Sequence, residues 1–144
     1  MTIDHELITR KLLLITADLE PLRTLYARGL DAFLASALEQ ASVERLLERT
    51  VTRMIDINYH VLTASGHPPP ADYHSSFLNL RDLGVLDAAF ASQIARSAGL
   101  RNRLVHDYED LDPRKIFEAL GTALHDVPIY LSQINNYVKQ NPHA

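Results

Sequence analysis

Apolar residues recur along most of this chain at alternating steps of three and four, the spacing that gathers them on one face of an α-helix. Long stretches of this kind cover residues 4–28, 38–64, 86–104 and 112–139, and a shorter one covers residues 72–83. No stretch of comparable length alternates apolar and polar residues as a half-buried β-strand does. The pattern predicts an all-α bundle with four main helices plus one short helix.

Prolines and glycines mark the expected limits of these helices. Pro21 and Pro128 fall inside the first and last helices. Proline lacks the N–H that would bond to the carbonyl four residues earlier, so each is expected to kink or break its helix. Residues 30–36 are expected to form a short connection, and the proline-rich segment 65–70 should end the second helix. Asp112 followed by proline is a good start for the last helix.

Length and composition are those of one globular domain. A chain of 144 residues with 47% hydrophobic and 22% charged residues can bury a core, and its most economical organisation is a single domain spanning 1–144. The absence of cysteine excludes disulfides, thiol nucleophiles and zinc–thiolate sites, and a cytoplasmic location fits. No apolar run approaches the roughly 20 residues needed to cross a bilayer. Residues 1–6 carry two acids and no cationic flank, so a signal peptide is not expected.

The net charge of −4 counts against an architectural DNA-binding protein, because phosphate neutralisation dominates that kind of affinity. It leaves room for an enzyme that handles RNA in one locally basic cleft, where arginines would have to be concentrated.

The most chemically distinctive segment lies at the end of the fourth predicted helix, where Arg101, Asn102, His106 and Tyr108 fall within eight residues. On an ideal helix Arg101 and His106 are about 140° apart around the axis, whereas Asn102 and His106 share a face. A straight helix therefore does not aim Arg101 and His106 at one atom. Three solutions are open: the helix ends here, the arginine side chain reaches round, or a second copy of the chain completes the site in a symmetric dimer.

Two interpretations of this segment are open on chemical grounds. Histidine is suited to proton transfer near neutral pH, and arginine binds phosphate and stabilises the charge that develops on it. Together they would suffice for RNA cleavage without a metal ion or other cofactor. Alternatively, the cations Arg101 and His106 only meet the negative end of the helix dipole.

The pattern of arginine, four residues, histidine, one residue and tyrosine, filled by Arg101, His106 and Tyr108, resembles the signature of the HepT-like ribonucleases of the HEPN superfamily. The resemblance extends over nearly the whole chain. It includes residues 43–45 and 54–57 of the second helix, the loop at 66–68, Asp72-Tyr73 with Phe77, and the segment 83–86.

This resemblance implies a single HEPN domain that acts as the toxin of a type VII-like toxin–antitoxin system. Such toxins are homodimers that cleave RNA without metal at a cleft between the two copies. Arg101 and His106 would be catalytic, and the substrate would be tRNA or mRNA. On chemical grounds apart from the resemblance, Asn102 is expected to orient His106 or contact the RNA phosphate, and Arg103 is expected either to support the RNA phosphate or to belong to a plain solvated face. The antitoxin would be a separate MntA-like minimal nucleotidyltransferase that transfers AMP to Tyr108 and so blocks the site. A catalytically silent helical module that binds a nucleotidyltransferase or a nucleotide is the alternative.

Asp56 and His60 are a further polar pair, four residues apart on one face of the second helix. They are expected either to make polar contacts to a neighbouring helix or to support the catalytic cleft. No second histidine shares the face of His60 at a suitable spacing, so metal binding is not expected.

Overall fold

A computed structural model describes residues 2–107 and 109–141, and within these residues the only regular secondary structure is helical. The predicted all-α class is therefore confirmed. The helices are α1 (His5–Ala27), α2 (Leu30–Leu34), α3 (Ala37–Ala64), α4 (Tyr73–Asp82), α5 (Ala88–Ile94), α6 (Ser97–His106) and α7 (Pro113–Gln140). No helix in the described parts of the chain is long and apolar enough to span a membrane.

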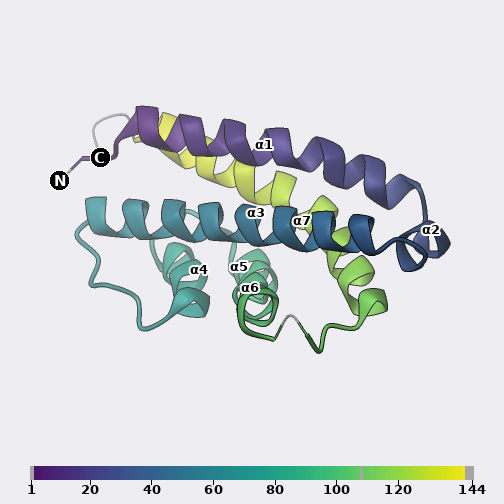
Figure 1. Ribbon diagram of the computed structural model, residues 1–144. Coiled ribbons are helices and arrows are strands. Elements are labelled where there is room, and N and C mark those ends of the chain that lie inside the picture. The colour runs from purple at the N-terminus through teal and green to yellow at the C-terminus, as the bar shows by residue number, and fades with distance from the viewer. Residues whose placement is uncertain (1, 108, 142–144) are drawn as a thin grey trace.

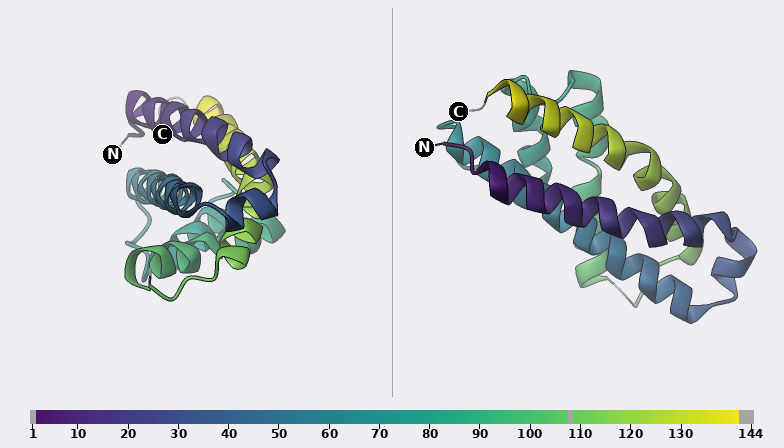
Figure 2. Two further views of the ribbon diagram at one scale, coloured as in Figure 1. Left: turned by 45° about the vertical axis from the view of Figure 1, so that its right-hand side comes forward. Right: turned by 90° about the horizontal axis from the view of Figure 1, so that it is seen from above.

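Helix α3 lies at the centre of the bundle. It packs against α1 and α7 on one side and against α4 and α6 on the other. Figure 1 shows the three shorter helices α4, α5 and α6 across α3 from α1, and the left view in Figure 2 shows the same order of layers. The apolar stripe predicted for this segment explains the position, because all six of its residues are buried: Val43, Leu47, Thr50, Met54, Ile57 and Val61.

The prolines inside α1 and α7 do not interrupt their helices. Helix α1 continues through Pro21 to Ala27, and α7 continues through Pro128 to Gln140. Next to Pro21, Leu22 is fully buried, and next to Pro128, Val127 is buried. We infer that this packing offsets the one backbone hydrogen bond that each proline removes.

The chain departs from the prediction at its fourth helix, which is two helices, α5 and α6, rather than one. At the junction the N–H groups of Arg96, Ala98 and Gly99 each bond to a carbonyl three residues earlier, which tightens the turn and redirects the chain. Ala95 and Ala98 are buried there, and their small side chains let the turn sit close to its neighbours. The expected connection at 30–36 likewise contains the short helix α2.

Candidate active site on helix α6

Helix α6 packs its buried residues Ala98 and Leu104 inward and exposes Asn102, Arg103 and His106. The helix ends at His106, and the N–H of Asp107 bonds to the carbonyl of Arg103, 2.9 Å away. Arg101 and His106 therefore stand on one continuous helix, about 140° apart by ideal geometry. The helix does end in this segment, but only at His106, so its end does not bring the two residues together.

Arg101 is half-buried and anchored by residues of α3 and α4. Its Nε donates to the hydroxyl of Thr52 at 3.3 Å, and its guanidinium carbon lies 5.1 Å from the centre of the Tyr73 ring, a cation–π contact. The Tyr73 ring in turn meets Tyr59 edge-on, with 6.2 Å between their centres. Within the described residues, no hydrogen bond or ion pair occupies the two terminal nitrogens of Arg101.

A small pocket of about 220 Å³ surrounds this arginine, and we call it the Arg101 pocket. It is lined by Thr52, Ile55, Asp56, Tyr59, Tyr73 and Arg101. Burial raises the pKa of Tyr59, and the neighbouring Tyr73 and Asp72 raise it further, so the phenol of Tyr59 stays neutral at ordinary pH. The pocket thus offers a fixed guanidinium beside the hydroxyl groups of Thr52 and Tyr59, and its one carboxylate, Asp56, is paired with Lys11 at 3.2 Å. The terminal nitrogens of the guanidinium suit an anionic group such as a phosphate.

His106 is exposed and is not among the residues that line the Arg101 pocket. No hydrogen bond or ion pair joins it to Arg101 in the described part of the chain. Asn102 is also exposed, one turn before His106 on the same face of α6. Tyr108, the predicted site of modification, lies outside the described residues.

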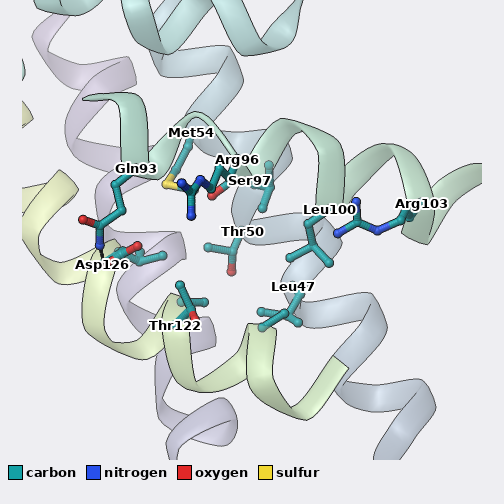
Figure 3. A pocket seen from close by; sticks show the side chains of 14 residues that line it. Leu47, Thr50, Met54, Gln93, Arg96, Ser97, Leu100, Arg103, Thr122 and Asp126 are labelled. Carbon is teal, nitrogen blue, oxygen red and sulfur yellow. Dashed lines mark hydrogen bonds between the residues drawn. The ribbon is translucent and has the colours of Figure 1, made fainter. Parts of the chain in front are cut away.

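Arg103 lies on the other side of α6 from Arg101. Two residues along a helix correspond to a turn of about 200°, so the two arginines point in nearly opposite directions. Arg103 lines a second and larger cavity of about 430 Å³ between α3, α6 and α7 (Figure 3). We call it the α6–α7 cavity. The predicted site residues are thus spread over three faces: Arg101 on one, Asn102 and His106 on the exposed face, and Arg103 on the third.

The Asp56–His60 pair makes contacts to α1 and the segment before it. Lys11 forms an ion pair with Asp56 at 3.2 Å, and the N–H of Asp4 donates to His60 Nε2 at 2.8 Å. The expectation of polar contacts to a neighbouring helix is confirmed. Asp56 also borders the Arg101 pocket. Among residues 2–107 and 109–141, no three His, Asp or Glu side chains are grouped so that they could hold a metal ion together.

Thr52 is a site residue that sequence reasoning missed. It lies on α3, 49 residues before Arg101, and nothing in its spacing connects it to the motif. Tyr73 is only one of the residues that resemble the family pattern, and no role is predicted for it. Both contacts depend on the direction of α6 after its junction with α5, which the apolar pattern does not reveal.

Comparisons with known proteins agree on one family. The family model described as "Ribonuclease HepT-like" matches residues 15–134. The chain is 38% identical over 136 residues to the tRNA nuclease HepT of Aphanizomenon flos-aquae (strain 2012/KM1/D3), covering 94% of this chain and 92% of that protein.

Solved structures agree on the fold. One is a tri-AMPylated HEPN toxin of Shewanella oneidensis in complex with an MNT antitoxin, with a TM-score of 0.84 at 23% identity over 92% of this chain and 98% of that one. Another is a toxin–antitoxin structure with AMP-PNP, with a TM-score of 0.81 at 23% identity over 90% of this chain and 98% of that one.

Proposed function

The chain belongs to the HepT-like ribonuclease family, and we propose that it is an endoribonuclease that acts as the toxin of a toxin–antitoxin pair. The observation that carries the proposal is on α6, where Arg101 is anchored through its Nε and lines a pocket, and His106 stands exposed at the helix end. The name of the cyanobacterial relative favours tRNA as the substrate, with mRNA as the other candidate. Such an enzyme would act in the cytoplasm.

In the proposed reaction, Arg101 holds the non-bridging oxygens of the phosphate to be cleaved, and His106 moves protons. The ribose 2′-hydroxyl gives up its proton, and its oxygen attacks the adjacent phosphorus. The bond between phosphorus and the 5′-oxygen breaks, and that oxygen takes up a proton. The products are a 2′,3′-cyclic phosphate on one fragment and a 5′-hydroxyl on the other. These steps need no metal ion, because the guanidinium itself stabilises the charge on phosphorus.

The separation of Arg101 and His106 around α6 supports a site built by two copies of the chain. In a symmetric dimer that joins the exposed faces of α6, His106 of one copy would come beside Arg101 of the other. Asn102, on the same face as His106, would orient the histidine or contact the phosphate. A homodimer with two equivalent sites is therefore part of the proposal.

Regulation by AMP transfer to Tyr108 completes the proposed function. Tyr108 follows His106 by two residues, so a nucleotide attached to its phenol oxygen would bring negative charge and bulk to the place where RNA phosphate must bind. A partner nucleotidyltransferase, encoded as a separate protein, would carry out the transfer. The complex of a tri-AMPylated HEPN toxin with an MNT antitoxin is the precedent among structures of this fold.

Cleavage of labelled tRNA and mRNA by the purified protein tests the activity. We expect His106→Ala and Arg101→Ala each to lower kcat/KM by about 100-fold or more, the range for loss of general acid–base or charge-stabilising groups. The matched controls His74→Ala and Arg114→Ala change exposed residues of the same types on α4 and α7 and should cleave normally. A wild-type protein that cleaves neither RNA after phosphodiesterase removal of any AMP would refute the proposal and favour the silent interaction module.

Mixing the two inactive variants tests the two-copy site. If Arg101→Ala and His106→Ala chains exchange freely, half of the dimers carry one of each, and each mixed dimer rebuilds one of its two sites. Activity should return to about a quarter of the wild-type value. If both residues of a site came from the same chain, mixing would restore nothing.

A further inference from the structure

The α6–α7 cavity has an unusual buried hydroxyl at its centre. Thr50 is fully buried on α3, and its Oγ1 has no hydrogen-bond partner among residues 2–107 and 109–141. A helical threonine can bond to the carbonyl four residues earlier, as Thr16 does to Leu12 at 2.8 Å and Thr24 to Glu20 at 3.2 Å. In Figure 3 the Thr50 oxygen instead points to the side on which the cavity lies, from beneath the lining, because the side chain itself is fully buried. A buried hydroxyl without a partner calls for an explanation, and a ligand that bonds to it is one.

The wall opposite α3 supplies a second fixed polar group. Asp126 on α7 is only 4% exposed, and its Oδ1 accepts from Gln93 Nε2 at 2.8 Å and lies 2.9 Å from His125 Nδ1. Gln93 comes from α5, so the pair ties the two sides of the cavity together. The Gln93 amide and the Asp126 carboxylate both line the cavity (Figure 3).

The rim of the cavity is cationic. Arg96 and Arg103 both line it, both are exposed, and within the described residues neither forms an ion pair. Apolar side chains, among them Met54 and Leu100, make up much of the remaining lining. The volume of about 430 Å³ falls within the range of about 300–1,000 Å³ typical of ligand pockets. The cavity therefore suits a ligand with an apolar body, hydrogen-bonding edges and an anionic group that reaches the rim.

We propose that the α6–α7 cavity is a subsite for one nucleotide of the RNA substrate, separate from the position of the cleaved phosphate. The base enters between Thr50 and the Gln93–Asp126 pair, and the phosphate of that nucleotide lies on Arg96 and Arg103. Arg103 stands beside the exposed face of α6 that carries His106, so a strand crossing this face reaches both places. The proposal rests on the proposed RNA cleavage and adds a position at which the enzyme reads the base.

Binding to catalytically inactive protein tests the subsite apart from cleavage. In a His106→Ala background, we would measure the affinity of fluorescent ten-nucleotide RNAs with each base at the centre, and of the four nucleoside 5′-monophosphates. We expect Arg96→Ala to weaken RNA binding about tenfold and to lower the slope of log Kd against log salt by about 0.7, as loss of one phosphate contact does. Arg114→Ala, an exposed arginine outside the cavity, should leave both unchanged.

Thr50→Val separates a ligand contact from a structural role. The hydroxyl has no partner in the part of the chain that the structure describes, so its replacement by a methyl group should leave thermal stability equal or higher. We expect RNA binding to fall about fivefold nonetheless. Asp126→Asn, which replaces an acceptor by a donor, should change the order of preference among the four bases.

The possible outcomes distinguish the proposal from its alternatives. Losses of RNA affinity in Thr50→Val and Asp126→Asn that depend on the central base, together with the smaller slope of log Kd against log salt in Arg96→Ala, support the subsite. They do so even if the wild-type protein cleaves no RNA. Free monophosphates that lose affinity in these variants while RNA binding stays unchanged would overturn the RNA assignment in favour of a free-nucleotide site. A change in dimer dissociation without a change in RNA affinity would overturn it in favour of a subunit contact, and unaltered binding throughout would overturn it altogether.

Discussion

Replacing Tyr130 with phenylalanine should destabilise the bundle through the loss of a single hydroxyl group. Tyr130 lies fully buried on α7, and its hydroxyl is 3.0 Å from the carbonyl of Met54 and 2.5 Å from Asn58 Oδ1. The chain of hydrogen bonds continues from Asn58 Nδ2 to Ser76 Oγ at 3.0 Å and from Ser76 Oγ to the carbonyl of Tyr73 at 2.6 Å. One buried network therefore joins α7, α3 and α4.

The magnitude follows from what Tyr130→Phe removes and what it keeps. The ring and its edge-on contact with Phe77, at 6.0 Å between centres, remain, so the packing loss is small. Asn58 Oδ1 loses its donor in a place that water does not reach, because Asn58 is fully buried. Leaving a buried acceptor unsatisfied costs about 1–3 kcal/mol of unfolding free energy. At roughly 4 °C per kcal/mol for a domain of this size, Tm should fall by about 4–12 °C.

Thermal unfolding followed by far-ultraviolet circular dichroism, at equal protein concentrations, measures this change. Tyr137→Phe is the matched control, since Tyr137 lies on the same helix, is half-buried, and its hydroxyl makes no hydrogen bond in the described structure. Its Tm should shift by less than about 2 °C. If Tyr130→Phe were as stable as the control, the Tyr130 hydroxyl would add nothing to the stability that the aromatic ring already provides. The hydrogen-bond network would then not be a source of stability.

Three further predictions follow from individual side chains. Burial raises the pKa of Tyr130 well above its ordinary value of 10.0, so as the pH rises the tyrosine ionises first in the unfolded chain. The free energy of unfolding should therefore decrease as the pH rises above about 10. In urea unfolding, this decrease should be steeper in wild type than in Tyr130→Phe by up to about 1.4 kcal/mol per pH unit. Thr52→Val and Tyr73→Leu should each raise KM for RNA about fivefold to tenfold, because each removes a contact that holds Arg101 in place. Thr52→Ser keeps the hydroxyl and Tyr73→Phe keeps the ring, so in the same kinetic assay their KM should stay near the wild-type value. Gly84→Ala should cost about 1 kcal/mol in urea unfolding, because residue 84 has φ +75°, a conformation that side chains with Cβ disfavour.

The helical stripes could be predicted from the sequence because burial on α3 depends only on the spacing of apolar residues. The junction between α5 and α6 could not, since Phe90, Ile94, Ser97 and Arg101 keep the same rhythm across it. A few backbone bonds to carbonyls three residues away break the helix without disturbing that rhythm. The anchoring of Arg101 by Thr52 was out of reach for the same reason: it depends on where the break sends α6.

The distribution of arginines explains how a chain of net charge −4 could still hold RNA. Arginines elsewhere in the bundle are largely neutralised: Arg49 and Arg53 of α3 both pair with the buried Asp18 of α1, at 2.9 and 2.7 Å. By contrast, Arg96, which caps the start of α6, and Arg101 and Arg103 within it form no ion pair in the described part of the chain. Because screening limits exposed charges to roughly 8–10 Å, RNA at α6 would experience these local guanidinium groups rather than the total charge of the protein. His106 and Arg103, which lie on adjoining faces of α6, would then provide neighbouring contacts for a strand that crosses the helix, and Arg101 of the second copy would complete the cleavage site.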